Sequence, residues 1–335
     1  MVVLVSRLSI LYKVIAMSLS NAVFIHSKRC SLLLLFGLMA WMSVGLGCDQ
    51  SPDVKKVSFE RSERIQVQPT PTKREESLKI AVAAMISPKE TFIFYKEILT
   101  YLSQELSIPI QLVQRETYEE VNNLLRDNEL DAAFVCTGSY IQGHEDFGME
   151  LLVAPVAYGK PIYYSYIIVP KDSPAQTLSD LRHKTFAFTD PMSNTGKLSP
   201  TYMLAKMGED EKLFFSSSIF TYSHDKSIEA VAKKLVNGAA VDSLIWDYLD
   251  RTNPHYTSKT KVISKSAPYG IPPVVVPREL DMQLKEELRS IFLHMHEDAR
   301  GKKILDEIMI DRFVEVSDDI YDNVRIMEKL IQDGK

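Results

Sequence analysis

The sequence predicts an α/β protein made of two units of alternating strands and helices, followed by a helical tail. Short apolar runs such as residues 78–84 have the length of buried strands. Between such runs lie segments with apolar residues at helical spacing, as in residues 89–106. The alternation stops and then restarts near residue 185. Alternating strands and helices favour mostly parallel sheets flanked by helices.

The expected elements follow in chain order. The first unit has strands at 78–84, 109–113 and 131–135, helices at 89–106 and 118–126, and extended runs at 151–156 and 163–169. The second unit has strands at 185–189, 218–222 and 241–245 and helices near 196–207 and 225–236. Pro272 and Pro273 mark a rigid connection, where we expect the chain to cross back to the first unit. The remainder is a strand at 274–276 and helices at 279–294, 297–309 and 318–332.

The composition excludes several classes of protein. The chain has 335 residues, of which 45% are hydrophobic and 25% charged, as in ordinary globular proteins of one or two domains. Collagen, pure disorder and a protein with many membrane spans are therefore excluded. The net charge is −5, which argues against nucleic acid as a partner. An anionic ligand must then be held by local dipoles and hydrogen bonds.

The N-terminus has the pattern of a secretory signal. Lys28 and Arg29 precede the apolar run 31–46, which is short for a membrane span and ends at Gly47 and Cys48. Gly-Cys resembles the lipobox of bacterial lipoproteins, with Gly45 where Leu is usual. We therefore expect a signal peptide at 1–47 and lipidation of Cys48. An uncleaved anchor helix is the alternative.

The segment after Cys48 is predicted to be a tether. Residues 49–76 are polar and contain three prolines, so 48–76 is expected to be a lipidated, flexible link to the membrane. Asp49 resembles the signal that keeps enterobacterial lipoproteins on the inner membrane. The predicted location is the periplasmic side of that membrane. With Cys48 acylated, Cys136 has no disulfide partner and is expected to be a small buried residue.

Residues 190–204, DPMSNTGKLSPTYML, have the pattern of an anion site. Ser193, Asn194 and Thr195 offer side-chain donors, and Gly196 lets the backbone approach a ligand. A helix start supplies unpaired N–H groups and a positive dipole end. Together they form a neutral cradle for a tetrahedral oxyanion. The same residues are also typical of an ordinary helix N-cap.

Other polar residues stand at the ends of expected elements. His224 opens a helix, where it can cap, pack or donate to an oxyanion. Asp242 can accept from a protonated ligand oxygen, pair with an amine or be a solvated loop acid. Four residues of the first unit are candidate site residues or packing residues: Tyr118, Ser139, Tyr140 and Tyr163.

From about residue 77 to 310, the chain resembles the periplasmic binding proteins of phosphate, phosphite and phosphonate ABC transporters. The most specific segment is 190–204, close to that family's Asp-Pro-x-Ser-x-Ser/Thr-Gly-x-x-x-Pro stretch. Supporting segments are ETYEEVNNLL (116–125), DAAFVCTGSY (131–140), YYSYIIVPKDSP (163–174), SHDKSIEAV (223–231), NGAAVDS (237–243) and SAPYGIPPVVV (266–276).

The resemblance implies a type 2 periplasmic binding fold with two hinged lobes and a ligand in the cleft between them. Lobe 1 is expected at 77–165, lobe 2 at 166–270, and a return to lobe 1 with C-terminal helices at 271–335. The resemblance also implies a role for each matching position. Ser193, Asn194 and Thr195 hold phosphoryl oxygens, Tyr118 and Tyr163 close from the opposite lobe, His224 donates and Asp242 accepts.

The function implied is capture of a phosphonate, phosphite or phosphate for an ABC transporter permease. Asn194 and Thr195 depart from the commonest family residues, which leaves the ligand open. A lipoprotein that senses a ligand and signals to a membrane kinase is an alternative. An enzyme is disfavoured, because Gly-x-Ser-x-Gly, His-Glu-x-x-His and Cys/His metal spacings are absent from the sequence. We therefore expect neither cofactor nor metal.

Overall fold

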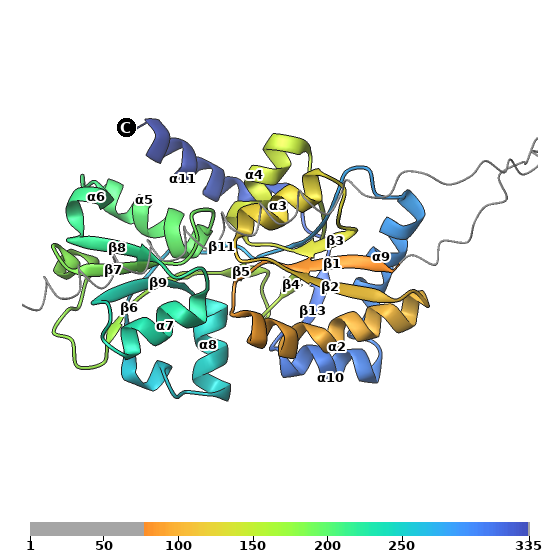
Figure 1. Cartoon of the computed structure of the whole chain (residues 1–335), viewed down its shortest axis with the longest axis horizontal. Helices are drawn as coiled ribbons and strands as arrows, with labels where there is room; N and C mark the ends of the chain where they lie inside the picture. The colour runs from red at the N-terminus through yellow and green to blue at the C-terminus, as the bar shows by residue number, and fades with distance from the viewer. Residues whose placement is uncertain (1–76, 334–335) are drawn as a thin grey trace, which may run out of the picture. The chain divides into compact units, whose positions relative to one another are not determined.

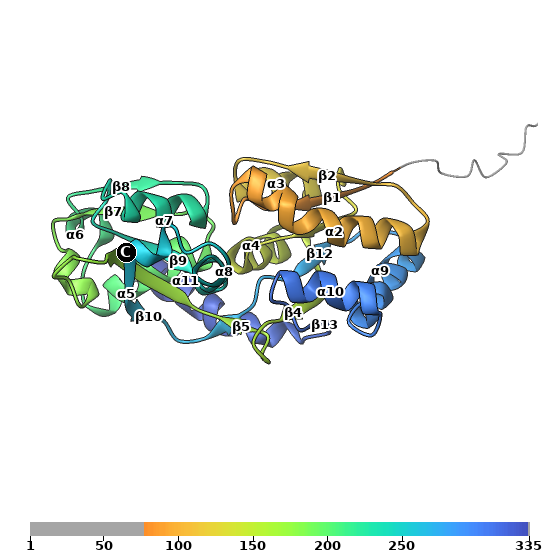
Figure 2. The same cartoon turned by 90° about the horizontal axis from the view of Figure 1, so that it is seen from below.

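The computed structural model describes residues 77–333, without the side chains of Pro88, residues 90–94 and Asp333. The predicted signal peptide, Cys48 and the tether lie outside the described residues. The described chain forms two lobes, each with a central sheet flanked by helices (Figures 1 and 2). No described helix has both the length and the hydrophobicity needed to cross a membrane.

The first lobe contains a six-stranded sheet in the order β13-β4-β12-β3-β1-β2. The strand β1 pairs in parallel with β2 and β3, whereas β12 and β13 pair antiparallel with their neighbours. Its strands are β1 (Leu78–Val82), β2 (Ile110–Gln114), β3 (Ala132–Phe134), β4 (Glu150–Val156), β12 (Val274–Val276) and β13 (Arg312–Val314). Its helices are α2 (Pro88–Leu106), α3 (Tyr118–Arg126), α4 (Thr137–Phe147), α9 (Met282–His294) and α10 (Ala299–Glu307).

The second lobe contains a five-stranded sheet in the order β10-β6-β9-β7-β8. The strand β7 pairs in parallel with β8 and β9, and β6 pairs antiparallel with β9 and β10. Its strands are β6 (Ser165–Pro170), β7 (Thr185–Phe188), β8 (Ser217–Phe220), β9 (Gly238–Asp242) and β10 (Thr260–Lys265). Its helices are α5 (Ser199–Lys206), α6 (Glu211–Phe214), α7 (His224–Ala232) and α8 (Ser243–Thr252), with a π-helical turn η2 (Asn194–Leu198) before α5.

Two short strands join the lobes. The strand β5 (Ile162–Tyr163) leads out of the first sheet, and β11 (Tyr269–Gly270) leads back. They pair antiparallel, with Tyr269 opposite Tyr163. This pairing ties the two crossings together at the point where the chain changes lobes.

The last helix differs from the rest of the C-terminal region. The helices α9 and α10 and the strands β12 and β13 join the first lobe. The helix α11 (Asp322–Asp333) instead packs against α5 of the second lobe (Figure 1). Met327 of α11 accepts a hydrogen bond from the hydroxyl of Tyr269 at 3.3 Å. The C-terminal helix therefore contacts both the crossing strands and the second lobe.

Each sheet is covered by buried apolar side chains on both faces. On β1, Ile80 and Val82 belong to one cluster, and Ala81 belongs to the cluster on the opposite face. The second lobe repeats this arrangement with two further clusters. Burial on both faces explains why these strands read as continuous apolar runs in the sequence.

The sequence expectations need three corrections. The sheets are mixed rather than mostly parallel, because the strands that return from the other lobe pair antiparallel. The strand expected at 241–245 ends at Asp242, whose carboxylate accepts from the N–H of Leu244 at 2.7 Å and begins α8. The elements α4, α6, α8, β10, β11 and β13 were not predicted.

Candidate functional site

The segment 190–204 forms a tight turn at the end of β7. Ser193 is the N-cap of η2, and its Oγ accepts a hydrogen bond from the N–H of Gly196 at 3.0 Å. A Cβ on Gly196 would lie 2.4 Å from Oγ1 of Thr189. Gly196 is therefore required by packing within the turn. Ser193 can therefore be both an N-cap and a ligand donor. Its oxygen accepts from Gly196, and its hydroxyl hydrogen stays available for another acceptor.

Buried polar atoms without hydrogen-bond partners gather around this turn. The described residues contain ten such side-chain atoms; five belong to predicted site residues and a sixth to Ser223, the neighbour of His224. An unpaired buried polar group costs about 1–3 kcal/mol, so six together indicate a site built for a polar ligand. The first lobe supplies Tyr118 Oη and Ser139 Oγ, and the second supplies Asn194 Oδ1, Thr195 Oγ1, Ser223 Oγ and His224 Nε2.

The protonation of His224 follows from its neighbours. The backbone N–H of Asp242 donates to Nδ1 of His224 at 3.0 Å. Because an amide N–H only donates, Nδ1 must accept, and the proton of the neutral ring lies on Nε2. Burial lowers the pKa of His224 to about 3, so the ring is neutral at physiological pH. His224 thus presents an uncharged N–H donor with no described partner.

Two buried carboxyl groups flank the donors. Burial raises the pKa of Asp242 to about 7, against the opposing effect of the backbone N–H groups that it accepts. Burial also raises the pKa of Asp190, whose Oδ1 accepts from the N–H of Met192 at 2.8 Å. The other oxygen of Asp190 accepts from the N–H of Tyr118 at 3.2 Å, which links the second lobe to the first.

The start of α4 lies directly against the turn of the second lobe. A Cβ on Gly138 would lie 2.2 Å from the carbonyl oxygen of Met192. The Cys136 thiol accepts backbone N–H groups of Asn194 and Gly138, and burial raises its pKa to about 11. Cys136 is therefore a buried, protonated thiol, as the sequence predicts, and the lobes contact each other here.

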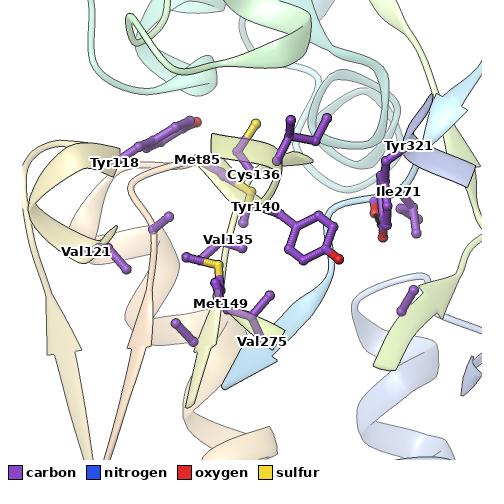
Figure 3. Packing of buried hydrophobic residues seen from close by; sticks show 14 of the residues in the cluster. Met85, Tyr118, Val121, Val135, Cys136, Tyr140, Met149, Ile271, Val275 and Tyr321 are labelled. Atoms are coloured by element: carbon purple, nitrogen blue, oxygen red, sulfur yellow. Dashed lines mark hydrogen bonds between the residues drawn. The ribbon is translucent and has the colours of Figure 1, made fainter. Parts of the chain in front are cut away.

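The tyrosines take different positions. Tyr118 is fully buried, and its hydroxyl faces that of Ser193 without a hydrogen bond of normal geometry. The Tyr163 hydroxyl, on the crossing strand β5, accepts from Nδ2 of Asn194 in the second lobe at 3.0 Å. Tyr140 does not join them: its hydroxyl donates to Asp318 at 2.6 Å, and Figure 3 shows its ring directed towards Tyr321. The Tyr140 hydroxyl is therefore engaged by Asp318, and a role of Tyr140 as a ligand residue stays a prediction.

Sequence reasoning missed two polar residues of this cluster. Ser223 precedes His224 and caps α7 without a side-chain hydrogen bond. Asp190 opens the most specific segment of the sequence but was given no role. Asp190 could have been recognised from the sequence as an acidic residue that follows a buried strand and precedes a proline.

An apolar cavity of about 120 Å³ adjoins the polar cluster. Side chains of both lobes line it, and it reaches Asp242. Residues of the first lobe and of α8 form opposite walls, among them Ile86, Phe134, Pro155, Ile271, Ile245 and Leu249.

Two lobes that enclose uncharged donors define a solute-binding protein of the type 2 periplasmic class. The chain belongs to the family described as "ABC transporter, phosphonate, periplasmic substrate-binding protein", whose model matches residues 80–321. It is 25% identical over 240 residues to the phosphonates-binding periplasmic protein of Escherichia coli, covering 70% of this chain and 71% of that one.

Solved structures resemble the described fold. The binding protein component of an ABC phosphonate transporter from Pseudomonas aeruginosa matches with a TM-score of 0.73 and 25% identity, covering 77% of this chain and 87% of that one. A Prochlorococcus marinus protein in complex with methylphosphonate matches with a TM-score of 0.71 and 20% identity, covering 77% of this chain and 99% of that one. The relatives named here are transport binding proteins.

Proposed function

We propose that this periplasmic binding protein holds a phosphonate or a closely related phosphorus oxyanion in the polar cluster between its lobes and delivers it to an ABC permease. The observation that carries the proposal is the set of six buried polar atoms without partners, contributed by both lobes. Membership of the phosphonate-binding family supports the same ligand class.

The donors match a tetrahedral oxyanion. The hydroxyls of Tyr118, Ser139 and Thr195 and the Nε2–H of His224 donate to phosphoryl oxygens, and the Ser193 hydroxyl adds a further donor. None of these groups carries a charge at neutral pH, so binding relies on aligned hydrogen bonds in a dry site. Such bonds are stronger there than in water.

Closure of the lobes depends on the ligand in this proposal. Tyr118 and Ser139 belong to one lobe, and Thr195 and His224 to the other, so only a closed form satisfies every ligand oxygen. A ligand that binds the closed form better shifts the population towards it. The permease then recognises the closed shape.

Asp242 gives the site its selectivity in this proposal. As a carboxylate it accepts from a P–OH group and repels an oxyanion that has no proton. Sulfate carries no proton at neutral pH, so it donates nothing to the carboxylate and is repelled by its charge. The site therefore favours phosphorus oxyanions over sulfate.

The membrane attachment is part of the proposal. The apolar run before Gly47 and Cys48 supports cleavage and acylation, with residues 49–76 as the tether that lets the lobes reach the permease. Metabolic labelling with a radioactive fatty acid tests this. The parent protein should become labelled and Cys48→Ser should not, and an unlabelled parent protein would contradict lipidation.

Calorimetric titration of the purified protein tests the ligand class. Methylphosphonate, phosphite, phosphate and sulfate are compared at one pH and ionic strength. We expect at least one phosphorus oxyanion to bind at least tenfold more tightly than sulfate. Equal affinity for sulfate would contradict the role of Asp242, and no binding of any phosphorus oxyanion would contradict the proposed function.

A further inference from the structure

The C-terminal helix α11 is fastened to the first lobe by polar contacts. Arg325, whose side chain is 21% exposed, pairs through Nη2 with Asp318 at 2.7 Å and through Nη1 with Asp322 at 2.8 Å. Its Nε lies 3.7 Å from Oε1 of Glu145 in α4. Asp318, which precedes α11, also accepts from the hydroxyl of Tyr140 in α4 at 2.6 Å. Arg325 therefore completes a polar network between α11 and α4.

The same helix presents apolar side chains to the second lobe. Val324 is fully buried and Met327 is 3% exposed. Both belong to the buried cluster against which Leu198 of η2 and Tyr202 of α5 pack. Figure 1 shows α11 reaching from the side of α4 to α5, with which it is in contact. One helix thus has polar contacts with the first lobe and apolar contacts with the second.

The apolar contacts lie next to the turn that carries the donors. Leu198 is the last residue of η2, the turn that contains Thr195. The hydroxyl of Tyr269 donates to Sδ of Met327 at 3.3 Å and lies 2.9 Å from Oγ of Ser199, the first residue of α5. Because the Tyr269 hydroxyl has one hydrogen, Ser199 is the donor in the second bond. A line of contacts therefore joins α11 to the end of the donor turn.

The two kinds of contact respond differently when the lobes separate. Hydrogen bonds between charged groups are strong and directional, so the network around Arg325 keeps α11 on the first lobe. The hydroxyl of Tyr321, just before α11, adds a bond to the carbonyl of Ile271 at 3.0 Å. Separation of the lobes then parts α11 from α5 and exposes Val324 and Met327 to water, which is unfavourable. The helix therefore opposes opening even without a ligand.

We propose that α11 is a strap that favours the closed arrangement of the lobes, and that Arg325 is the positioning residue that fastens this strap to the first lobe. The inference rests on the opening and closing of the lobes in the proposed function. Its test needs no ligand, so the strap and the ligand class can fail separately.

Cys136 supplies the signal for the test. It is 2% exposed, and its thiol accepts the backbone N–H of Asn194 from the second lobe. Opening of the lobes removes Asn194 and admits a reagent to the thiol. The ligand-free full chain is treated with N-ethylmaleimide, and mass spectrometry follows modification of the peptide that contains Cys136, which separates its signal from that of Cys48.

Variants on both sides of α11 test the strap. Arg325→Leu should be modified at Cys136 at least fivefold faster than the parent. Arg325→Lys keeps the charge but not the planar fork, so its rate should lie between the two. Met327→Ala weakens the apolar side, should also be faster than the parent, and serves if Arg325→Leu does not fold. Arg126→Leu is the control, because Arg126 is half exposed and pairs with Asp127 in the first lobe, and it should keep the parent rate.

The urea dependence of the modification rate distinguishes a strap from a general loss of stability. Separation of the lobes exposes much less surface than unfolding does, so the rate in Arg325→Leu should rise only weakly with urea at low concentration. A rate that rises as steeply as the unfolding equilibrium would show that the variant is merely less stable, and the inference would be wrong.

The outcomes separate the two proposals. If Arg325→Leu and Met327→Ala both keep the parent rate, the strap is refuted, and binding of methylphosphonate by the parent still supports the proposed function. If the variants are modified faster but the parent binds no phosphorus oxyanion, the strap stands and the proposed function fails.

Discussion

The backbone N–H of Asp242 donates to Nδ1 of His224 at 3.0 Å, and this one bond sets the character of the candidate site. It fixes the ring proton on Nε2, where the ring has no described partner. Burial keeps the ring neutral and favours the neutral form of Asp242 as well. His224 and Asp242, which are joined through the backbone of Asp242, are thus both biased towards their uncharged forms.

The first prediction concerns the pH dependence of stability. The pKa of His224 is lowered from 6.5 to about 3 in the folded protein. Between pH 6.5 and pH 3, this histidine is therefore protonated in the unfolded chain but not in the folded one, so the free energy of unfolding decreases as the pH falls. The pKa of Asp242 is raised from 3.8 to about 7 in the folded protein. Between pH 7 and pH 3.8, this carboxyl group is therefore protonated in the folded chain but not in the unfolded one, so the free energy of unfolding increases as the pH falls. In the parent protein, the two contributions largely cancel between about pH 4 and pH 6.5.

Single variants should uncover the two slopes. Relative to the parent, His224→Gln should gain stability as the pH falls from 7 to 4, and Asp242→Asn should lose stability as the pH falls from 6.5 to 4. Each slope approaches about 1.4 kcal/mol per pH unit. Urea unfolding at several pH values measures them, and other groups with raised pKa, such as Asp190, cancel in the comparison. Slopes of the same sign in both variants would refute this assignment.

The second prediction concerns Thr195, whose buried hydroxyl has no partner. Thr195→Val keeps the shape and removes the unpaired group, so the free energy of unfolding of the free protein should stay unchanged or rise by about 1 kcal/mol. Methylphosphonate affinity should fall at least tenfold, because a hydrogen bond to a charged group is lost. Chemical unfolding and calorimetry give the two values.

Thr260→Val is the matched control for Thr195→Val. Thr260 is also buried, but its hydroxyl donates to the carbonyl of Thr257 at 2.9 Å and accepts from Trp246 at 3.2 Å. This variant should lose about 1 kcal/mol of stability and keep its affinity. If Thr195→Val behaves in the same way, Thr195 has only a structural role.

The third prediction concerns contact between the lobes at Gly138. A Cβ there would meet the carbonyl oxygen of Met192 at 2.2 Å, so Gly138→Ala should hold the lobes apart. We expect at least a tenfold loss of methylphosphonate affinity and a larger radius of gyration in X-ray scattering with ligand present. Gly143→Ala is the control, because its Cβ would meet Met149 and Phe147 within one lobe. It should lower stability without changing the radius, and equal radii for the two variants would count against closure at Gly138.

The fourth prediction concerns sulfate. Below about pH 7, Asp242 becomes protonated and can donate to an oxyanion instead of repelling it. The affinity for sulfate should therefore rise as the pH falls from 8 to 6, and Asp242→Asn should bind sulfate with little dependence on pH. Calorimetry over this range checks both. A flat sulfate profile in the parent would show that Asp242 does not face the ligand.

The sequence allowed a good part of this site to be predicted, because its pieces are local. Ser193 and Asn194 lie in one turn. His224 begins a helix whose apolar spacing can be recognised in the sequence. Tyr140 shows the limit of such reasoning. It follows Ser139 in α4, and successive residues of a helix point about 100° apart, so the two side chains diverge. Without the helix orientation, which distant contacts such as that with Asp318 set, the sequence cannot separate them.

The helices and strands, too, were predicted where the local sequence determines them and missed where distant contacts do. The strands β1 and β7 carry continuous apolar runs and were predicted close to their observed bounds. The helix α8 was missed because residues 241–245 were predicted as a strand, whereas the side chain of Asp242 caps a helix that begins at Ser243. The strand β10 was missed because it has few buried residues and is defined by its partner β6.

The central claim is that uncharged hydroxyls at the start of η2 hold a phosphorus oxyanion, and one titration tests it most directly. Methylphosphonate is titrated calorimetrically into the parent protein and into the double variant Ser193→Ala, Thr195→Ala, after unfolding curves have shown that both are folded. We predict binding to the parent and at least a hundredfold weaker binding to the double variant. Equal affinity in the two proteins would contradict the claim.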